Sequence, residues 1–296
     1  MRVLVTGGTG FVGPSIVHAI RAEGHDVRAL VRRPDSKSSR RLATWGCGLV
    51  EGDTTDAASL ERAVEACDAV VHLVAIIDRS RERTERVMTQ GTRDLLDAAE
   101  RAGVGRFVLM SAGGTGEASK DLTPYFRAKW DQEQIVAASA LGHVIFRPSL
   151  VFGRDGGPLP LLVRQVRWSP LVAVIGTKRV QPIWIDDVAA CFTKSLSTPE
   201  ATNRTFDLVG PDIVTWQELN DRITRVLGKR RATFQMPMGI ARMGAAVAER
   251  LPLSVPISRD ALTMLEFEDN VGDMGPATET FGVRPIALTE QIRRAV

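Results

Sequence analysis

The stretch VTGGTGFVG, residues 5–13, decides the fold of this 296-residue chain. It joins a short apolar run to a helical pattern that extends to Glu23, and it spaces its glycines as Gly7, Gly10 and Gly13. A tight turn needs a residue that tolerates positive φ, a pyrophosphate needs close backbone approach, and a helix N-terminus offers free N–H groups. The spacing therefore predicts a dinucleotide-binding turn, with a plain loop-to-helix junction as the alternative.

The first half of the chain alternates short apolar runs with longer helical patterns. Strands are expected over residues 3–5, 27–31, 49–50, 69–74, 106–110 and 143–146, and helices over 11–23, 56–66, 83–102 and 124–140. Strands this apolar are buried on both faces, as parallel strands between helices must be. The alternation predicts an α/β fold of the Rossmann type, a right-handed, doubly wound parallel sheet.

Beyond Pro148 this rhythm is interrupted by glycines and prolines between residues 153 and 170. We predict a nucleotide-binding Rossmann domain over residues 1–152 and a small C-terminal substrate lobe over residues 153–296. Within that lobe, segments at about 178–210 are expected to return to the main body.

The returning segment contains a strand pattern at 180–185, followed by a helix opened by Asp186 or Asp187. A capping box formed by Thr215 and Glu218 then predicts the start of a further helix.

Composition and charge exclude several classes of protein. The chain is 44% apolar, and its 38 basic and 35 acidic residues are interspersed, without the basic stripe that nucleic-acid binding needs. Cys47, Cys67 and Cys191 are far apart and lack ligand spacing with the four histidines, so we expect no metal site. With no signal-peptide pattern and no apolar run long enough to span a bilayer, a cytoplasmic location is expected.

The end of the second strand bears on which dinucleotide binds. NAD enzymes place an acid there, about 20 residues beyond the glycines, to bind the ribose 2′-hydroxyl. Here Arg32 and Arg33 take its place. Guanidinium groups favour a 2′-phosphate, so NADP(H) is preferred over NAD(H), unless the arginines belong only to a solvated loop. After the third strand, Asp53 could accept the adenine amino group, or it could be a turn former or helix cap.

The only tyrosine of the chain, Tyr125, precedes Lys129 by four residues, although the chain has 10 Phe and 5 Trp. This spacing places both side chains on one face of a helix. A neighbouring ammonium stabilises a phenolate and lowers the pKa of the phenol from near 10, and the same lysine can reach ribose hydroxyls. The pair predicts an acid–base site; the alternative is an amphipathic helix with an aromatic residue and a solvated lysine.

Together these motifs resemble the short-chain dehydrogenases/reductases, of the extended or atypical, NAD(P)-dependent epimerase/dehydratase-like kind. The resemblance extends over nearly the whole chain and includes residues 6–13, 52–53, 125–129, 147–149 and 181–189. The runs 124–129 and 158–176 look most like the branch that contains the nucleotide-binding accessory subunit of respiratory complex I and its bacterial relatives.

The resemblance implies roles for individual residues. Those expected around the pyrophosphate are Gly7, Thr9, Gly10, Phe11, Val12 and Gly13. Asp53 and Thr54 would meet the adenine, Val74 and Ala75 would line the cofactor channel, and Pro148 would lie beside the nicotinamide. A Ser or Thr after the fifth strand would bind the substrate carbonyl. Ser111 or Thr115 could do so, while Gly113 stands where many extended members carry the hydroxyl.

Two functions of different classes follow from these residues. The first is an NADP-dependent oxidoreductase or epimerase-like enzyme. In it, Tyr125 transfers the proton of the substrate hydroxyl, Lys129 lowers the pKa of Tyr125, and hydride passes between nicotinamide and a small-molecule substrate. The second is a non-catalytic NADPH-binding scaffold or assembly factor, which the incomplete serine position favours.

The C-terminal lobe contains two apolar segments whose function the sequence leaves open. Residues 159–175 combine apolar side chains with Arg164, Arg167 and Trp168, and residues 236–253 are rich in methionine. Both could contact a membrane surface or a lipophilic, quinone-like substrate, or they could simply pack within the lobe.

Overall fold

The computed structural model describes residues 1–78, 80–248 and 259–296, which form two compact units. Unit 1 comprises Met1–Pro148, Ile185–Leu208 and Asp273–Arg284. Unit 2 comprises the described residues of Ser149–Trp184, Val209–Gly272 and Pro285–Val296. The chain therefore enters unit 1 three times, and the sequence pattern gave no sign of the third passage.

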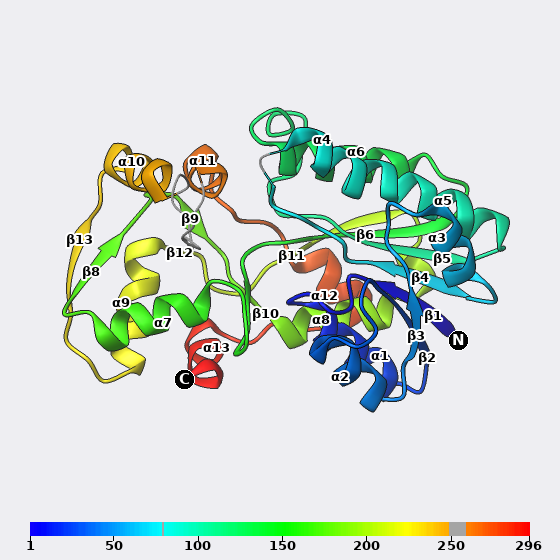
Figure 1. Cartoon of the computed structure of the whole chain (residues 1–296). Coiled ribbons are helices and arrows are strands. Elements are labelled where there is room, and N and C mark those ends of the chain that lie inside the picture. The colour runs from blue at the N-terminus through cyan, green and yellow to red at the C-terminus, as the bar shows by residue number, and fades with distance from the viewer. Residues whose placement is uncertain (79, 249–258) are drawn as a thin grey trace. The chain divides into compact units, whose positions relative to one another are not determined.

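Unit 1 is built on a seven-stranded sheet with the order β11-β6-β5-β4-β1-β2-β3, in which every neighbouring pair is parallel (Figure 1). The strands are β1 (Arg2–Thr6), β2 (Asp26–Val31), β3 (Gly48–Glu51), β4 (Ala69–His72), β5 (Arg106–Met110), β6 (Gly142–Pro148) and β11 (Arg204–Leu208). The order reverses between β1 and β4, and in such sheets ligands bind at the carboxyl ends of the strands at this switch point. The expected Rossmann-type sheet is confirmed.

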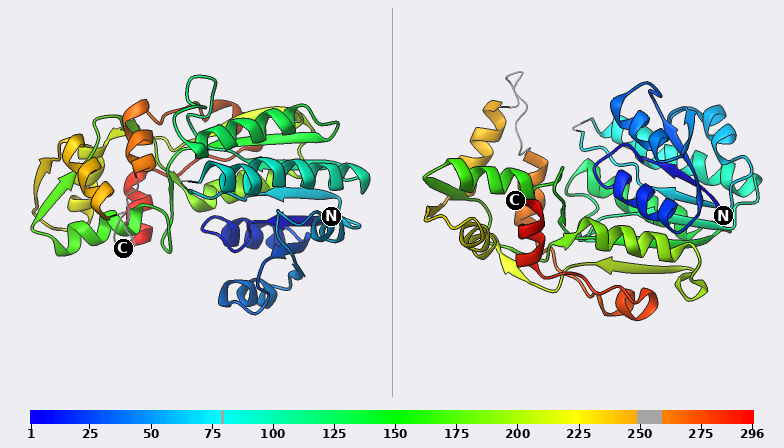
Figure 2. Two further views of the ribbon diagram at one scale, coloured as in Figure 1. Left: turned by 45° about the horizontal axis from the view of Figure 1, so that its top comes forward. Right: turned by 90° about the horizontal axis from the view of Figure 1, so that it is seen from below.

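Helices cover both faces of this sheet (Figures 1 and 2). They are α1 (Gly13–Ala22), α2 (Lys37–Thr44), α3 (Ala57–Val64), α4 (Arg81–Thr84), the π-helix η1 (Glu85–Gln90), α5 (Gly91–Arg101), α6 (Pro124–Ala137), α8 (Ile185–Ser195), the 3₁₀-helix η2 (Pro199–Ala201) and α12 (Gly275–Phe281). Helices α3, α5 and α6 lie on one face, and α1, α8 and α12 lie on the other. Because both faces are covered, the middle residues of the central strands are apolar, as Val3, Leu4 and Val5 illustrate with no exposed surface.

The sequence missed some elements of unit 1. Helix α2 has the polar sequence KSSRRLAT, and β11 has the mixed sequence RTFDL, so neither shows the periodicity of a buried element. The helix expected over 83–102 is a continuous helical run over 81–101 that contains η1.

The single strand expected over 180–185 is wrong. Two short strands, β9 (Arg179–Val180) and β10 (Ile183–Trp184), flank Pro182 and pair with different partners. Proline has no N–H to donate to a ladder, which explains the interruption.

The described residues of unit 2 form helices and three two-stranded sheets, β10-β7, β12-β9 and β13-β8. Its other elements are β7 (Val151–Phe152), α7 (Leu159–Trp168), β8 (Leu171–Val174), β12 (Val214–Thr215), α9 (Trp216–Val226), β13 (Ala232–Gln235), α10 (Met238–Ala248), α11 (Arg259–Phe267) and α13 (Leu288–Ala295). The capping box at the start of α9 is confirmed, because Thr215 and Glu218 each accept a hydrogen bond from the other's backbone N–H.

The methionine-rich segment contains α10, and its residues 249–253 lie outside the described part of the chain. No helix of the described residues is long and apolar enough to cross a membrane.

Candidate functional site

The glycine turn between β1 and α1 packs directly against neighbouring backbone atoms. Gly7 has φ +76°, and a Cβ added to it would lie 3.0 Å from the carbonyl carbon of Leu73. A Cβ on Gly13 would lie 2.5 Å from the backbone oxygens of Gly7 and Gly8, so no larger residue fits there. The N–H of Gly10 donates to the carbonyl of Gly7 at 3.0 Å and closes the turn.

The N-terminus of α1 follows this turn without a side-chain cap. Thr9 and Gly10 are exposed, whereas Phe11 and Val12 are half-buried. An uncapped helix N-terminus behind a glycine turn offers N–H groups and a positive dipole end to an anion. This arrangement fits the pyrophosphate of a dinucleotide.

The segment after β4 completes the other side of the glycine turn. The N–H of Leu73 donates to the carbonyl of Thr6 at 3.0 Å, so the chain follows β1 one residue beyond the strand. Val74 therefore lies against Gly7, and the next residue, Ala75, is exposed. Both predicted channel residues thus lie at the switch point of the sheet.

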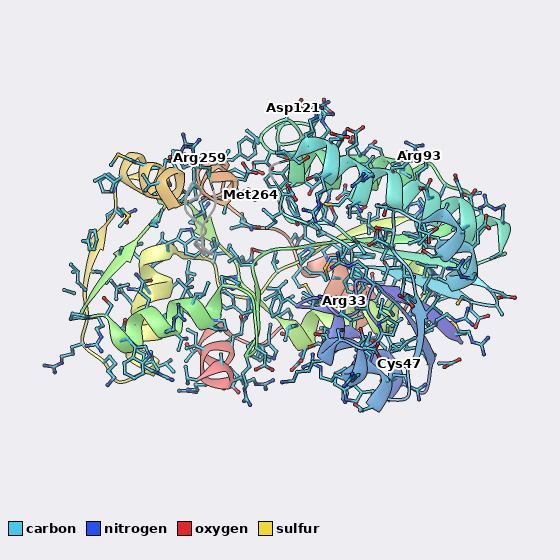
Figure 3. All side chains as sticks on the ribbon, in the orientation of Figure 1. Arg33, Cys47, Arg93, Asp121, Arg259 and Met264 are labelled. Carbon is cyan, nitrogen blue, oxygen red and sulfur yellow. The ribbon has the colours of Figure 1, made fainter. Side chains whose placement is uncertain are left out.

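Arg32 and Arg33 follow β2, and both are exposed; Figure 3 labels Arg33. The Arg32 side chain is 77% exposed, with its Nε 4.0 Å from Oδ2 of Asp53. An exposed ion pair at this distance contributes little free energy, so the guanidinium can bind another anion. The backbone carbonyl of Arg33 accepts hydrogen bonds from Ser36 and Ser39 at the start of α2, which fixes this bend.

Asp53 and Thr54 differ in what their side chains can reach. Oδ1 of Asp53 accepts hydrogen bonds from the N–H and the hydroxyl of Thr55, so this oxygen shapes the turn. Thr54 is buried, and its hydroxyl donates to the carbonyl of Val87 in η1 at 3.2 Å. Of the two residues predicted to meet adenine, only Asp53 therefore keeps its side chain at the surface.

The loop after β5 continues to pair with β6. The N–H of Ser111 donates to the carbonyl of Phe146 at 2.7 Å, and the N–H of Gly113 donates to that of Pro148 at 2.8 Å. Ser111 and Thr115 are both buried, and their hydroxyl oxygens lie 3.4 Å apart. The structure thus brings Pro148 and both candidate hydroxyl groups to the carboxyl end of β5.

Lys129 is held against the same strand end. Its side chain is buried, 1% exposed, and Nζ donates to the carbonyl of Met110 at 2.7 Å, one residue before Ser111. Nζ also lies 5.9 Å from the ring centroid of Tyr125 on the preceding turn of α6. The hydroxyl of Thr123 accepts from the N–H of Phe126, which starts α6 at Pro124 and places Tyr125 in its first turn.

The pKa values of this pair are set by burial. Burial raises the pKa of Tyr125 to about 12. Burial also lowers the pKa of Lys129 to about 7, against the effect of the Glu133 carboxylate, which raises it. The expectation that Lys129 lowers the pKa of Tyr125 is therefore wrong for this structure, because loss of water disfavours both charged forms.

A partly buried ion pair lies one helical turn beyond Lys129, with Glu133 buried and Arg147 29% exposed. Oε1 of Glu133, on α6, accepts from Nε of Arg147 at 2.9 Å, and Oε2 accepts from Nη2 at 2.5 Å. This bidentate geometry joins α6 to the end of β6. The Arg147 guanidinium offsets part of the negative charge that Glu133 presents to Lys129.

A histidine that the sequence did not single out links the glycine turn to α6. His72 ends β4 and is fully buried, with Nδ1 2.6 Å from the hydroxyl of Thr6 and Nε2 3.0 Å from that of Thr92. Gln132, on α6, donates to the Thr92 hydroxyl at 2.7 Å. Burial lowers the pKa of His72 to about 3, so the ring is neutral.

The tautomer of His72 decides which hydroxyl it binds as donor. In one tautomer, the Thr92 hydroxyl donates to the carbonyl of Met88 at 2.6 Å and accepts from Nε2–H of His72, while Nδ1 accepts from the hydroxyl of Thr6. In the other, Nδ1–H donates to the Thr6 hydroxyl and Nε2 accepts from the amide of Gln132 at 3.4 Å. A polar residue at the end of an otherwise apolar strand was the sequence signal for this network.

Among the described residues, no group of three or more His, Cys, Asp or Glu side chains is placed to hold a metal ion. Cys47, Cys67 and Cys191 are free and buried.

Known proteins with similar sequences and structures support the same fold and family. A model of the NAD dependent epimerase/dehydratase family matches residues 3–208. The ceramide reductase of Caulobacter vibrioides is 31% identical over 249 residues, which cover 83% of this chain and 77% of the reductase. The photosystem II assembly factor Ycf39 of Synechocystis is 27% identical, over 98% of this chain and 88% of the factor.

The crystal structure of the Bordetella bronchiseptica enzyme WbmG in complex with NAD has a similar fold. Its TM-score is 0.78 at 21% sequence identity, and the match covers 100% of this chain and 92% of WbmG. The narrower resemblance to the complex I accessory branch stays a prediction.

Proposed function

The chain belongs to the NAD dependent epimerase/dehydratase family, and on that premise we propose that it is an NADP(H)-dependent oxidoreductase that interconverts a carbonyl and an alcohol. The observation that carries this proposal is the placement of Lys129. Its ammonium is buried at the end of β5, between Tyr125 on its own helix and the carbonyl that precedes Ser111.

The residues around the glycine turn fit a nicotinamide dinucleotide. Gly7 and Gly13 let the turn pack directly against neighbouring backbone, which holds its shape, and the uncapped start of α1 supplies N–H groups for phosphates. Arg32 and Arg33 are the groups that would bind a 2′-phosphate, which favours NADP(H) over NAD(H). The WbmG structure contains NAD, which supports a cofactor of this class without deciding between the two.

The side chains at the end of β5 supply the proton chemistry. When bound, the nicotinamide would give or take a hydride at the substrate carbon. With a pKa of about 12, Tyr125 keeps its proton at neutral pH and can donate it to the oxygen of a carbonyl that gains a hydride. Ser111 or Thr115 would orient that oxygen, and Lys129 would hold the ribose and become more fully charged as the phenolate forms.

The substrate that we propose is a lipophilic ketone or quinone. One relative is named a ceramide reductase, which indicates that the family includes enzymes for lipid substrates. Unit 2 exposes several large apolar side chains, which is consistent with a protein that meets lipophilic molecules.

Steady-state consumption of NADPH with a panel of long-chain ketones and quinones tests the proposal. We expect Tyr125→Phe to lower kcat/KM by about 10²–10⁴-fold while NADPH still binds, because the variant loses only the transferable proton. Trp130→Phe, on the same helix, is the matched control and should leave turnover within about twofold. NADPH consumption that Tyr125→Phe leaves unchanged would rule out this mechanism.

Cofactor preference has a separate test. Arg32→Ala should weaken the binding of NADPH by about tenfold or more and that of NADH by less than about twofold, because only NADPH carries the 2′-phosphate. Fluorescence titration of both nucleotides measures this difference. Equal weakening of both would refute the 2′-phosphate assignment.

A second candidate function is a scaffold or assembly factor that binds NADPH without turning it over. Gly113 favours it, because many extended family members carry a hydroxyl there, and one relative is named an assembly factor. Bound NADPH that stays reduced across the whole ketone and quinone panel would support this function. Turnover of any compound would support the enzyme.

A further inference from the structure

One surface of unit 2 combines exposed aromatic and apolar side chains. Trp168 ends α7 and is 78% exposed, Leu171 starts β8 and is 50% exposed, and Phe234 on β13 is 40% exposed. Large apolar side chains usually lie in a core, so three of them exposed on neighbouring elements indicate a contact surface.

The pairing of β8 with β13 places Leu171 and Phe234 on one face. The strands run parallel and side by side, with Leu171 opposite Ala232 and Ala173 opposite Phe234 (Figure 1). Paired residues point to the same side of a sheet, and alternate residues point to the other. On the opposite face Val172 and Val174 of β8 are buried, so the Leu171 face is the outer one.

Hydrogen bonds from Arg231 to the end of α7 bring a basic segment toward these apolar side chains. Nε of Arg231 donates to the carbonyl of Val166 at 2.8 Å, and Nη2 donates to that of Arg167 at 3.1 Å. Lys229 and Arg230, which directly precede Arg231 in the chain, are exposed, so these hydrogen bonds bring their segment toward the end of α7. We call the following set the basic aromatic face: Arg167, Trp168, Leu171, Lys229, Arg230 and Phe234.

The sequence around this face is depleted of acidic residues. Residues 156–184 contain four cations and residues 222–248 contain six, and neither segment contains an Asp or Glu. Arg179, Arg222 and Arg242 form ion pairs with acids from other segments. The basic aromatic face itself is thus positively charged in a chain whose net charge is only +3.

We propose that the basic aromatic face docks unit 2 onto the surface of an anionic lipid bilayer. Aromatic rings such as that of Trp168 prefer the headgroup level of a bilayer, where the ring is buried and its N–H stays hydrated. Lysine and arginine near the surface are attracted by anionic headgroups. Since no described helix can cross a membrane, the contact is peripheral, and it would stand even if the chain transfers no hydride.

Co-sedimentation of the full chain with vesicles tests the charge part of this proposal. We expect binding to phosphatidylcholine vesicles that contain phosphatidylglycerol and little binding to phosphatidylcholine alone. Each cation contributes roughly fivefold near such a surface, so Lys229→Glu with Arg230→Glu should weaken binding by about 30-fold or more. Arg93→Glu with Arg284→Glu makes the same change of net charge on exposed residues of unit 1 and should leave binding within about twofold.

The aromatic part has its own control. Trp168→Ala should weaken vesicle binding by about tenfold, because the ring no longer inserts between headgroups. Ile213→Ser changes an apolar residue of unit 2 that is 49% exposed, outside the basic aromatic face, and should have little effect.

Three results would overturn the proposal. The first is binding that is equal on neutral and anionic vesicles, and the second is equal loss with the two charge-reversal pairs. The third is a lack of vesicle binding together with self-association in sedimentation velocity that Trp168→Ala abolishes. That result would make the face a contact between two copies of the chain. Thermal unfolding of each variant distinguishes a lost contact from a lost fold.

Discussion

In unit 1 several charged and polar side chains are buried and paired, whereas unit 2 carries most of the exposed large apolar side chains of the described residues. His72, Lys129 and Glu133 are all less than 5% exposed, and each has a hydrogen-bond partner. Trp168 and Met243 are 78% and 64% exposed. Buried polar groups are costly unless they are paired, and exposed apolar groups are unfavourable unless something covers them.

This difference indicates how each unit contributes to function. In unit 1 the paired groups fix the positions of the side chains proposed for chemistry, so substitutions there should change stability and cofactor binding together. In unit 2 the exposed groups are available to a partner, so substitutions there should change association and leave the fold intact. Four predictions test this comparison.

The largest effect is expected at the glycine turn of unit 1. Gly13→Ala places a Cβ 2.5 Å from backbone atoms that have no room to move, and we expect a loss of about 4 kcal/mol or more in the free energy of unfolding. Urea unfolding and NADPH titration measure the two consequences. Gly116→Ala is the control, since nothing lies within 4 Å of its added Cβ, and it should change stability by less than about 0.5 kcal/mol.

The next effect concerns the ion pair of α6 and β6. Arg147→Met leaves the Glu133 carboxylate buried without its partner and should lower the free energy of unfolding by about 3 kcal/mol at neutral pH. Adding Glu133→Gln removes the unpaired buried carboxylate, so the double variant should recover at least half of that loss in the free energy of unfolding. A double variant as unstable as the sum of the single ones would show that the two side chains are not coupled.

A smaller, pH-dependent effect is expected from His72. Its pKa is about 3 in the folded protein and 6.5 ordinarily, so between these values the unfolded chain binds the proton and the folded protein does not. Stability should therefore be complete about one pH unit above 6.5 and fall with acidification, by about 2 kcal/mol between neutral pH and pH 5. His72→Asn should lower stability at neutral pH and flatten this part of the profile; an unchanged slope would mean that His72 does not cause it.

The smallest effect is expected in unit 2. Trp168→Ala should change the free energy of unfolding by less than about 0.5 kcal/mol, because a side chain that is 78% exposed contributes little packing. Chemical unfolding measures it, and a loss above about 2 kcal/mol would show that Trp168 belongs to the packing of unit 2. The comparison between the two units would then fail.

Features encoded by neighbouring residues were predictable from the sequence. The glycine turn, the capping box of Thr215 and the i, i+4 spacing of Tyr125 and Lys129 are local patterns, and the structure contains each of them. Contacts between distant residues left no such pattern. Glu133 and Arg147 pair across 14 positions, and His72 contacts Thr6 across 66, so neither partner indicates the other in the sequence.

The sequence by itself determined the strand–turn–helix order and the residues that reach the carboxyl ends of the strands, because these follow from local backbone preference and hydrophobic periodicity. Only the tertiary structure decided the protonation of the candidate site. Spacing predicts that Lys129 lowers the pKa of Tyr125, yet burial raises it to about 12, because desolvation depends on all the elements packed around the phenol. The exposure of Trp168 and the burial of His72 were likewise decided by packing between segments that are distant in the chain.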